Sequence, residues 1–197
     1  MKKLIVLLAA LAALAAAPAG QRIDGDHVRV SVPAAWKPMP EAAKAMRTGL
    51  VGAGAPVTGD AQAYGDTAAG VFALLLWVDS KQAVTTVRPE VEAFMGGLRG
   101  SLEASGAKAS RWDISETATR YSVRFGLSRP GVEAVGRATS LVDKKGILHG
   151  YAVACIRTGD AQSKPKASEQ ASAACEAALS SFELSWKDAE LKKLEKK

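Results

Sequence analysis

Apolar and polar residues alternate along much of the chain in the pattern of β-strands. Val28, Val30 and Val32 alternate with polar neighbours, which predicts a strand with one buried face. The segment 71–78 is apolar on both faces and is typical of a central strand covered on both sides. Further alternating segments follow in quick succession at 112–114, 121–127, 133–142 and 147–156. This close spacing predicts an antiparallel meander in the second half of the chain.

Two turn sequences indicate how the strands of the meander are connected. Arg129-Pro130-Gly131 is typical of a type II turn, with Pro and Gly at the two central positions. Asp143-Lys144-Lys145-Gly146 begins with Asp and ends with Gly, as many four-residue turns do. Both turns therefore predict neighbouring strands that run in opposite directions.

Three segments have the apolar period of amphipathic helices, and they cover 41–48, 89–105 and 166–181. The second begins at Pro89 and ends before Gly106, which are favourable residues at those two ends. Three glycines inside this helix each weaken it by up to about 1 kcal/mol relative to alanine, and they are Gly96, Gly97 and Gly100. Packing against the rest of the protein must offset that loss.

Two stretches outside these helices complete the organisation of the chain. The segment 49–66 holds five glycines and one proline, which predicts an irregular loop that could form the rim of a ligand site. Residues 182–186 are predicted to form a final short strand.

The order of these elements and two short motifs resemble the PsbP-like superfamily. The motifs are Val30-Ser31-Val32-Pro33-Ala34-Ala35-Trp36 and Ser181-Phe182-Glu183-Leu184, and the resemblance covers about residues 26–186. This superfamily includes the extrinsic protein of the photosynthetic oxygen-evolving complex, the yeast Ran-release factor and many bacterial exported proteins. The resemblance implies an α+β fold, an α/β/α sandwich with a mainly antiparallel sheet covered by helices on both faces. It also implies a binding or accessory module, and no motif matches the manganese-cluster role of the photosynthetic member.

The first 19 residues have the three regions of a secretory signal peptide. A positive start at Lys2 and Lys3 is followed by an apolar stretch of about 11 residues and by the cleavage pattern Ala17-Pro18-Ala19. The stretch is too short to span a bilayer, which takes about 20 residues. No cysteine near the cut could carry a lipid anchor, and no later stretch reaches transmembrane length. The chain is therefore predicted to be exported to the bacterial periplasm or the medium, with 20–186 as one domain.

Composition and charge narrow the classes of function. Hydrophobic residues make up 48% and charged residues 23% of the chain, as in an ordinary globular protein. The net charge of +6 falls to about +4 without Lys2 and Lys3, which is far below a nucleic-acid-binding signature. Residues 187–197 form a tail with five Lys and three acidic residues. We expect a solvated, frayed helix there, with weak contact to an anionic surface as the alternative.

Cys155 and Cys175 are the two cysteines, and in an oxidising compartment such a pair predicts a disulfide. The bond would join the strand that carries Cys155 to the helix that carries Cys175. A closed loop of about 20 residues corresponds to roughly 3 kcal/mol of stability. Two free buried thiols are the alternative. A redox-active pair is not expected, because the spacing is not C-x-x-C.

The remaining candidate residues match no catalytic or metal-binding spacing. His27 and His149 are the only histidines, and neither belongs to a zinc motif. His149 could join an acid and a serine in a hydrolytic triad, but the chain has no G-x-S-x-G motif to support this. We interpret His149 as a half-exposed strand histidine. Asp24, Asp26 and Asp60 could join a calcium site, but their spacing matches no calcium-binding loop, and we interpret them as scattered surface carboxylates. The four tryptophans are interpreted as core residues, and they are Trp36, Trp77, Trp112 and Trp186.

These observations predict an exported, non-enzymatic binding or accessory module of the bacterial envelope. It is expected to use no cofactor and no metal and to bind an unidentified protein or small ligand. Two alternatives stay open: a periplasmic hydrolase that uses His149, and an envelope-surface protein attached through its basic tail. A carbohydrate-binding platform built from the tryptophans is a further, sharper idea.

Overall fold

The computed structural model describes residues 20–52, 57–104, 106–159 and 165–195. The predicted signal peptide, residues 1–19, therefore lies outside the described residues, as do the last two lysines of the tail. Among the described residues, no helix is both long enough and apolar enough to cross a membrane.

In the described part of the chain, ten strands form two antiparallel sheets. The larger sheet has seven strands in the order β3-β4-β5-β9-β8-β7-β6, and the smaller one has the order β1-β2-β10. Their bounds are β1 Gly20–Gly25, β2 Val28–Pro33, β3 Lys37–Pro38, β4 Val57–Asp66, β5 Val71–Ser80, β6 Lys108–Glu116, β7 Arg120–Arg129, β8 Val132–Val142, β9 Leu148–Thr158 and β10 Glu183–Leu184. The helices are α2 Pro40–Gly52, α3 Val87–Ala104 and α4 Pro165–Ser180, and a short 3₁₀ turn, η1, covers Asp188–Glu190.

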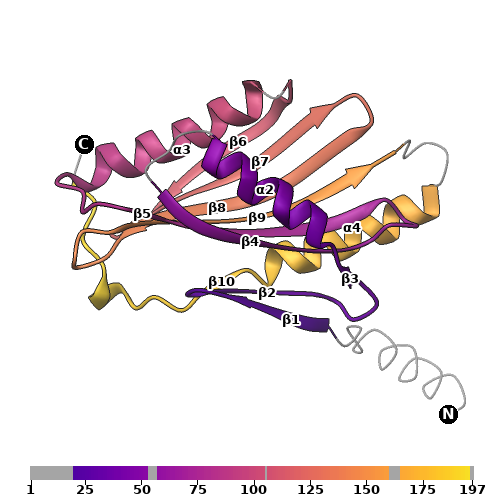
Figure 1. The fold of residues 1–197 in the computed structure, drawn as a ribbon, viewed down its shortest axis with the longest axis horizontal. Helices are drawn as coiled ribbons and strands as arrows, with labels where there is room; N and C mark the ends of the chain where they lie inside the picture. Colours follow the sequence, from indigo (N-terminus) through magenta and orange to yellow (C-terminus); the bar gives the residue numbers. More distant parts are fainter. Residues whose placement is uncertain (1–19, 53–56, 105, 160–164, 196–197) are drawn as a thin grey trace, which may run out of the picture.

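The seven-stranded sheet lies between two layers (Figure 1). Helices α2 and α3 pack on one face, while α4 and the small sheet cover part of the other. This confirms the predicted α+β fold with helices on both faces. The small sheet is an addition to the prediction, because β1 has only one buried apolar residue, Ile23, and so lacks the alternation that identifies a strand.

The central strands β5 and β9 are apolar on both faces because both layers pack against them. Leu75 and Val153 point toward α4 and the small sheet, whereas Leu76 and Ala152 point toward α2 and α3. Successive side chains of a strand point to opposite faces, so a strand in the middle layer needs apolar residues at every position. The continuous apolar run at 71–78 therefore predicted the correct place for β5.

Both predicted turns connect the strands of the meander. Gly131 has φ 72° and Gly146 has φ 91°, a region that favours glycine. The Gly146 N–H donates a hydrogen bond of 3.0 Å to the carbonyl of Asp143. Because the β7–β8 turn has only two residues, Arg129 pairs with Val132 and the register of every later pair follows from it.

The predicted irregular loop at 49–66 is wrong. Helix α2 extends to Gly52, and β4 pairs with β5 residue by residue from Val57 to Asp66. A Cβ atom at Gly59 or Gly65 would collide with the backbone or side chains of β5. The glycines of this segment therefore allow a close approach of two strands, a role that composition alone does not distinguish from that of a loop.

The expected solvated helix at the C-terminus is also wrong. Residues 185–195, which we call the C-terminal strap, run across the end of both sheets and hold only the η1 turn. Leu191 is 1% exposed and belongs to the core cluster between the two sheets. The Glu195 carboxylate accepts hydrogen bonds of 3.0 and 2.7 Å from the N–H groups of Val87 and Arg88. Glu195 therefore caps the start of α3. These bonds lower the pKa of the Glu195 carboxyl.

Alanine substitutions of the three glycines in α3 are expected to stabilise the protein. Gly96, Gly97 and Gly100 are exposed, and a Cβ atom at any of them meets nothing within 4 Å. Each change to alanine should raise the free energy of unfolding by up to about 1 kcal/mol, measured by urea unfolding. Gly150→Ala is the matched control, because its Cβ would collide with the ring of Phe94 and should destabilise. A loss of stability for all three α3 variants would contradict this reading of the helix.

Candidate functional site

The described residues leave part of the sheet face that carries α4 uncovered. Helix α4 contacts β2, β5, β8 and β9, and the core on this side contains no residue of β6 or β7 among the described residues. Polar side chains occupy this open area, and Arg111, Asp113, Ser115 and Arg124 are exposed there. The face of an antiparallel sheet is usually either covered by other elements or polar. The uncovered part of this face is polar and carries charged side chains.

Three arginines on three adjacent strands form what we call the arginine face: Arg111 on β6, Arg124 on β7 and Arg137 on β8. In the register of the sheet, Arg124 lies directly opposite Arg137, and Asp113 lies opposite Arg124 on its other side. Directly opposed residues have Cβ atoms about 4.5–5.5 Å apart, and like charges in this position are destabilising. The Arg124–Arg137 pair is therefore unfavourable for folding by itself.

The three arginines differ in how they are held. Arg111 forms an ion pair with Asp113 on its own strand. Arg137 donates a 3.2 Å hydrogen bond from Nη1 to the carbonyl of Leu179, and its guanidinium lies 5.8 Å from the ring centre of Phe182. Arg124 has neither a hydrogen-bonding partner nor an ion-pair partner among the described residues.

Charge is concentrated where these side chains meet. Burial, and then the positive charge of Arg124, lower the pKa of Arg137. An arginine nevertheless stays protonated at every physiological pH, so both side chains keep their charge. The arginine face thus holds one guanidinium fixed by the protein, that of Arg137, and a second one, that of Arg124, which forms no ion pair among the described residues although Asp113 lies opposite it.

A groove of about 120 Å³ lies between the arginine face and α4. Val135 and Gly136 of β8 line it, as do Leu179 and Ser180 at the end of α4. Glu176 is the one acidic residue among its lining residues. The groove therefore combines a positively charged sheet surface with a mixed polar and apolar side provided by the helix.

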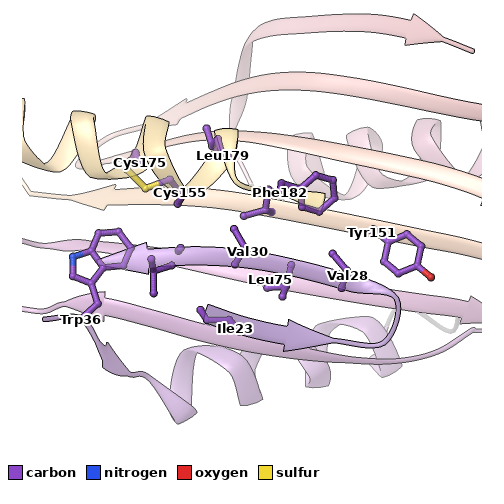
Figure 2. Packing of buried hydrophobic residues seen from close by; sticks show 14 of the residues in the cluster. Ile23, Val28, Val30, Trp36, Leu75, Tyr151, Cys155, Cys175, Leu179 and Phe182 are labelled. Atoms are coloured by element: carbon purple, nitrogen blue, oxygen red, sulfur yellow. A yellow bond between two sulfur atoms is a disulfide. The ribbon is translucent and has the colours of Figure 1, made fainter. Parts of the chain in front are cut away.

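The position of α4 is fixed by Cys155 of β9 and Cys175 of α4, which lie at disulfide distance with Cα atoms 5.4 Å apart. Figure 2 shows the two side chains meeting between helix and strand, with Leu179 one turn further along α4. Val135, which lines the groove, is paired with Cys155 across the β8–β9 ladder. The two cysteines therefore hold α4 in place beside the arginine face.

His149 is buried, so its interpretation as a half-exposed strand histidine is wrong: it is 8% exposed. Its Nδ1 atom lies 2.6 Å from a carboxylate oxygen of Asp79, and its Nε2 atom lies 3.6 Å from one of Asp143. The ring of Trp186 covers it at a centroid distance of 4.7 Å. Because both ring nitrogens face carboxylates, neither is placed to take a proton from a serine, as a hydrolytic triad requires.

The other candidate residues lie apart from each other. Asp24 pairs with Arg22 at 2.8 Å, and Asp60 pairs with Arg47 at 2.9 Å. The hydrogen bond from Arg47 lowers the pKa of Asp60. Within the described part of the chain, no group of three or more His, Cys, Asp or Glu residues could hold a metal ion. The four tryptophans all pack in or against the core clusters, as predicted, and they are Trp36, Trp77, Trp112 and Trp186.

The arginine face was missed in the sequence, although two signals for it are present. Tyr121, Val123, Phe125 and Leu127 alternate on the buried face of β7, which places Arg124 on the opposite face. The two-residue turn then sets Arg124 opposite Arg137. What the sequence does not show is that α4 stops short of these strands.

Comparisons with known proteins give distant structural matches only. No family model matches the chain, and no curated protein matches it. A mutant of protein Mog1 matches with 10% identity and a TM-score of 0.43, over 84% of this chain and 95% of that one. The Ran-binding protein Mog1p of Saccharomyces cerevisiae matches with 11% identity and a TM-score of 0.42, over 85% and 96%. LpqN, involved in cell envelope biogenesis of Mycobacterium tuberculosis, matches with 12% identity and a TM-score of 0.38, over 84% and 90%.

Proposed function

We propose that this chain is an exported, non-enzymatic binding module that recognises an acidic partner through its arginine face. The observation that carries the proposal is the direct opposition of Arg124 and Arg137 in the sheet, with Arg124 unpaired among the described residues. This arrangement costs stability in the free protein. An acidic group bound between the two guanidiniums would remove the repulsion and gain charge-assisted hydrogen bonds.

Export is supported by the cysteine pair. The two sulfur atoms lie at disulfide distance, and disulfides persist in oxidising compartments such as the bacterial periplasm. A signal peptide at residues 1–19 would deliver the chain there and would be removed from the mature protein. We therefore place the binding module in the bacterial envelope or the medium.

The hydrolase alternative gains no support from the surroundings of His149. The residue is buried, and Asp79 and Asp143 face its two ring nitrogens. His149 has a structural role, because it contacts Asp79 of β5, Asp143 of the β8–β9 turn and Trp186 of the C-terminal strap. Attachment of the chain to an envelope surface through its basic tail stays a prediction. Three of the tail's lysines, Lys187, Lys192 and Lys193, belong to the C-terminal strap, which is hydrogen-bonded to the rest of the protein.

Binding of a synthetic ten-residue glutamate peptide tests the proposal. Reversing one charge, Arg124→Glu, should weaken binding at least tenfold, since a hydrogen bond to a charged group is worth about 1.5–3 kcal/mol. Lys44→Glu is the matched control, because Lys44 is exposed on α2, on the other side of the sheet, and the change in net charge is the same. Isothermal titration at two salt concentrations measures both variants. Equal weakening by the two changes would mean that only net charge matters, and the proposal would fail.

A further inference from the structure

We infer that the groove between Arg124, Arg137 and the end of α4 is a binding site for a phosphate monoester group. This inference rests on the proposed function and gives the chemical class of the group that the arginine face recognises. It is drawn from the number of charges in the groove, from the geometry of its donors and from its size.

The two directly opposed guanidiniums favour an anionic group that can accept hydrogen bonds from both of them. Arg111 is already paired with Asp113, so Arg124 and Arg137 are the arginines left to face a ligand. A carboxylate offers only two oxygens, whereas a phosphate monoester offers three acceptor oxygens that can be shared between two guanidiniums. A phosphate monoester carries about −1.5 to −2 charges at neutral pH and can neutralise both.

The donors of the groove also match a phosphate group. A guanidinium presents five N–H donors in a planar fork that fits an oxyanion through two parallel hydrogen bonds. Arg137 uses one N–H on the carbonyl of Leu179 and is held near the Phe182 ring, so its remaining donors are fixed in place before a ligand arrives. Arg124 lies opposite it and is able to close on the second side of the same group.

The size of the groove suits one head group. Its volume of about 120 Å³ gives room for a phosphate group. Glu176 lines the groove, and its negative charge repels an anion there. A neutral residue at this position is therefore expected to increase the affinity for phosphate.

Titration with glycerol phosphate, sulfate and acetate, followed by NMR shifts of the backbone amides of β7 and β8, tests the inference. Glycerol phosphate and sulfate should bind at the arginine face, and acetate at least tenfold more weakly. Arg124→Gln should weaken the binding of glycerol phosphate at least tenfold, whereas Glu176→Gln should strengthen it severalfold. Because Arg137 contacts α4, the conservative change Arg137→Lys is used there, and it should lower the affinity without unfolding the protein.

The outcomes separate this inference from the proposed function. If acetate binds as well as glycerol phosphate, or if Arg124→Gln leaves phosphate binding unchanged, the phosphate site is overturned. If the glutamate peptide binds at the arginine face while glycerol phosphate does not, the proposed function stands and the inference fails. Vesicles that contain phosphatidic acid form a second arm, in which binding that depends on Arg124 assigns the phosphate to a lipid head group. Absence of binding to every one of these probes would overturn both.

Discussion

Replacement of Leu191 by alanine is expected to lower the free energy of unfolding by about 2–5 kcal/mol, although the residue lies only six positions before Lys197. Leu191 is 1% exposed and belongs to the core cluster that includes the small sheet and the central strands, and it bridges to Asp143. The strap is hydrogen-bonded on both sides of it, since Lys144 N–H donates to Glu190 and Lys192 N–H donates to Val142. With its backbone held in this way, the strap cannot move in to fill the cavity that the substitution leaves.

Urea unfolding of Leu191→Ala measures the effect, and Lys193→Ala is the matched control. Lys193 lies two residues away in the same strap, but its side chain is exposed and has no ion-pair partner among the described residues. Its replacement should change the free energy of unfolding by no more than about 0.5 kcal/mol. A loss below 1 kcal/mol for Leu191→Ala would mean that the C-terminal residues are a loosely held tail, as their composition first indicated.

The strap shows what kind of contact the sequence does not reveal. Its lysines and acidic residues resemble those of a solvated tail, and nothing in the local pattern marks Leu191 as buried. Glu195 caps α3 although it lies 108 residues after Val87 in the sequence. Local periodicity carries no information on such a pairing, because the pairing depends on the path that the chain takes after α4.

The meander was predictable because its determinants are local. Alternation identifies the buried faces of β7 and β8, and the turn at Pro130-Gly131 sets the register between them. The same reasoning failed for β4, where the glycines serve a close approach to β5. It failed again for His149, which is covered by the ring of Trp186 and contacts Asp79, a residue 70 positions away on a neighbouring strand. The arginine face lies between these cases, since its register is local but its exposure depends on the placement of α4.

Loss of the bond between Cys155 and Cys175 is expected to cost about 3 kcal/mol of stability and to weaken binding at the arginine face. The stability term follows from the sequence separation of 20 residues between the two cysteines, which limits the freedom of the unfolded chain. The binding term follows from Leu179, one turn after Cys175, whose carbonyl holds the guanidinium of Arg137. If α4 moves more freely, Arg137 loses its fixed orientation and part of the affinity for an acidic group with it.

A Cys155→Ala, Cys175→Ala double variant tests both terms, by urea unfolding and by titration with the glutamate peptide. Ala173→Ser is the matched control for the helix, because Ala173 is exposed on α4 and contributes to neither the bond nor the groove. Wild-type protein treated with a reductant should behave like the double variant, which separates the loss of the bond from the loss of sulfur packing. Unchanged peptide affinity in a folded double variant would show that α4 does not position Arg137. The arginine face would then act through the sheet alone, because the opposition of Arg124 and Arg137 is set by the β7–β8 register and needs no helix.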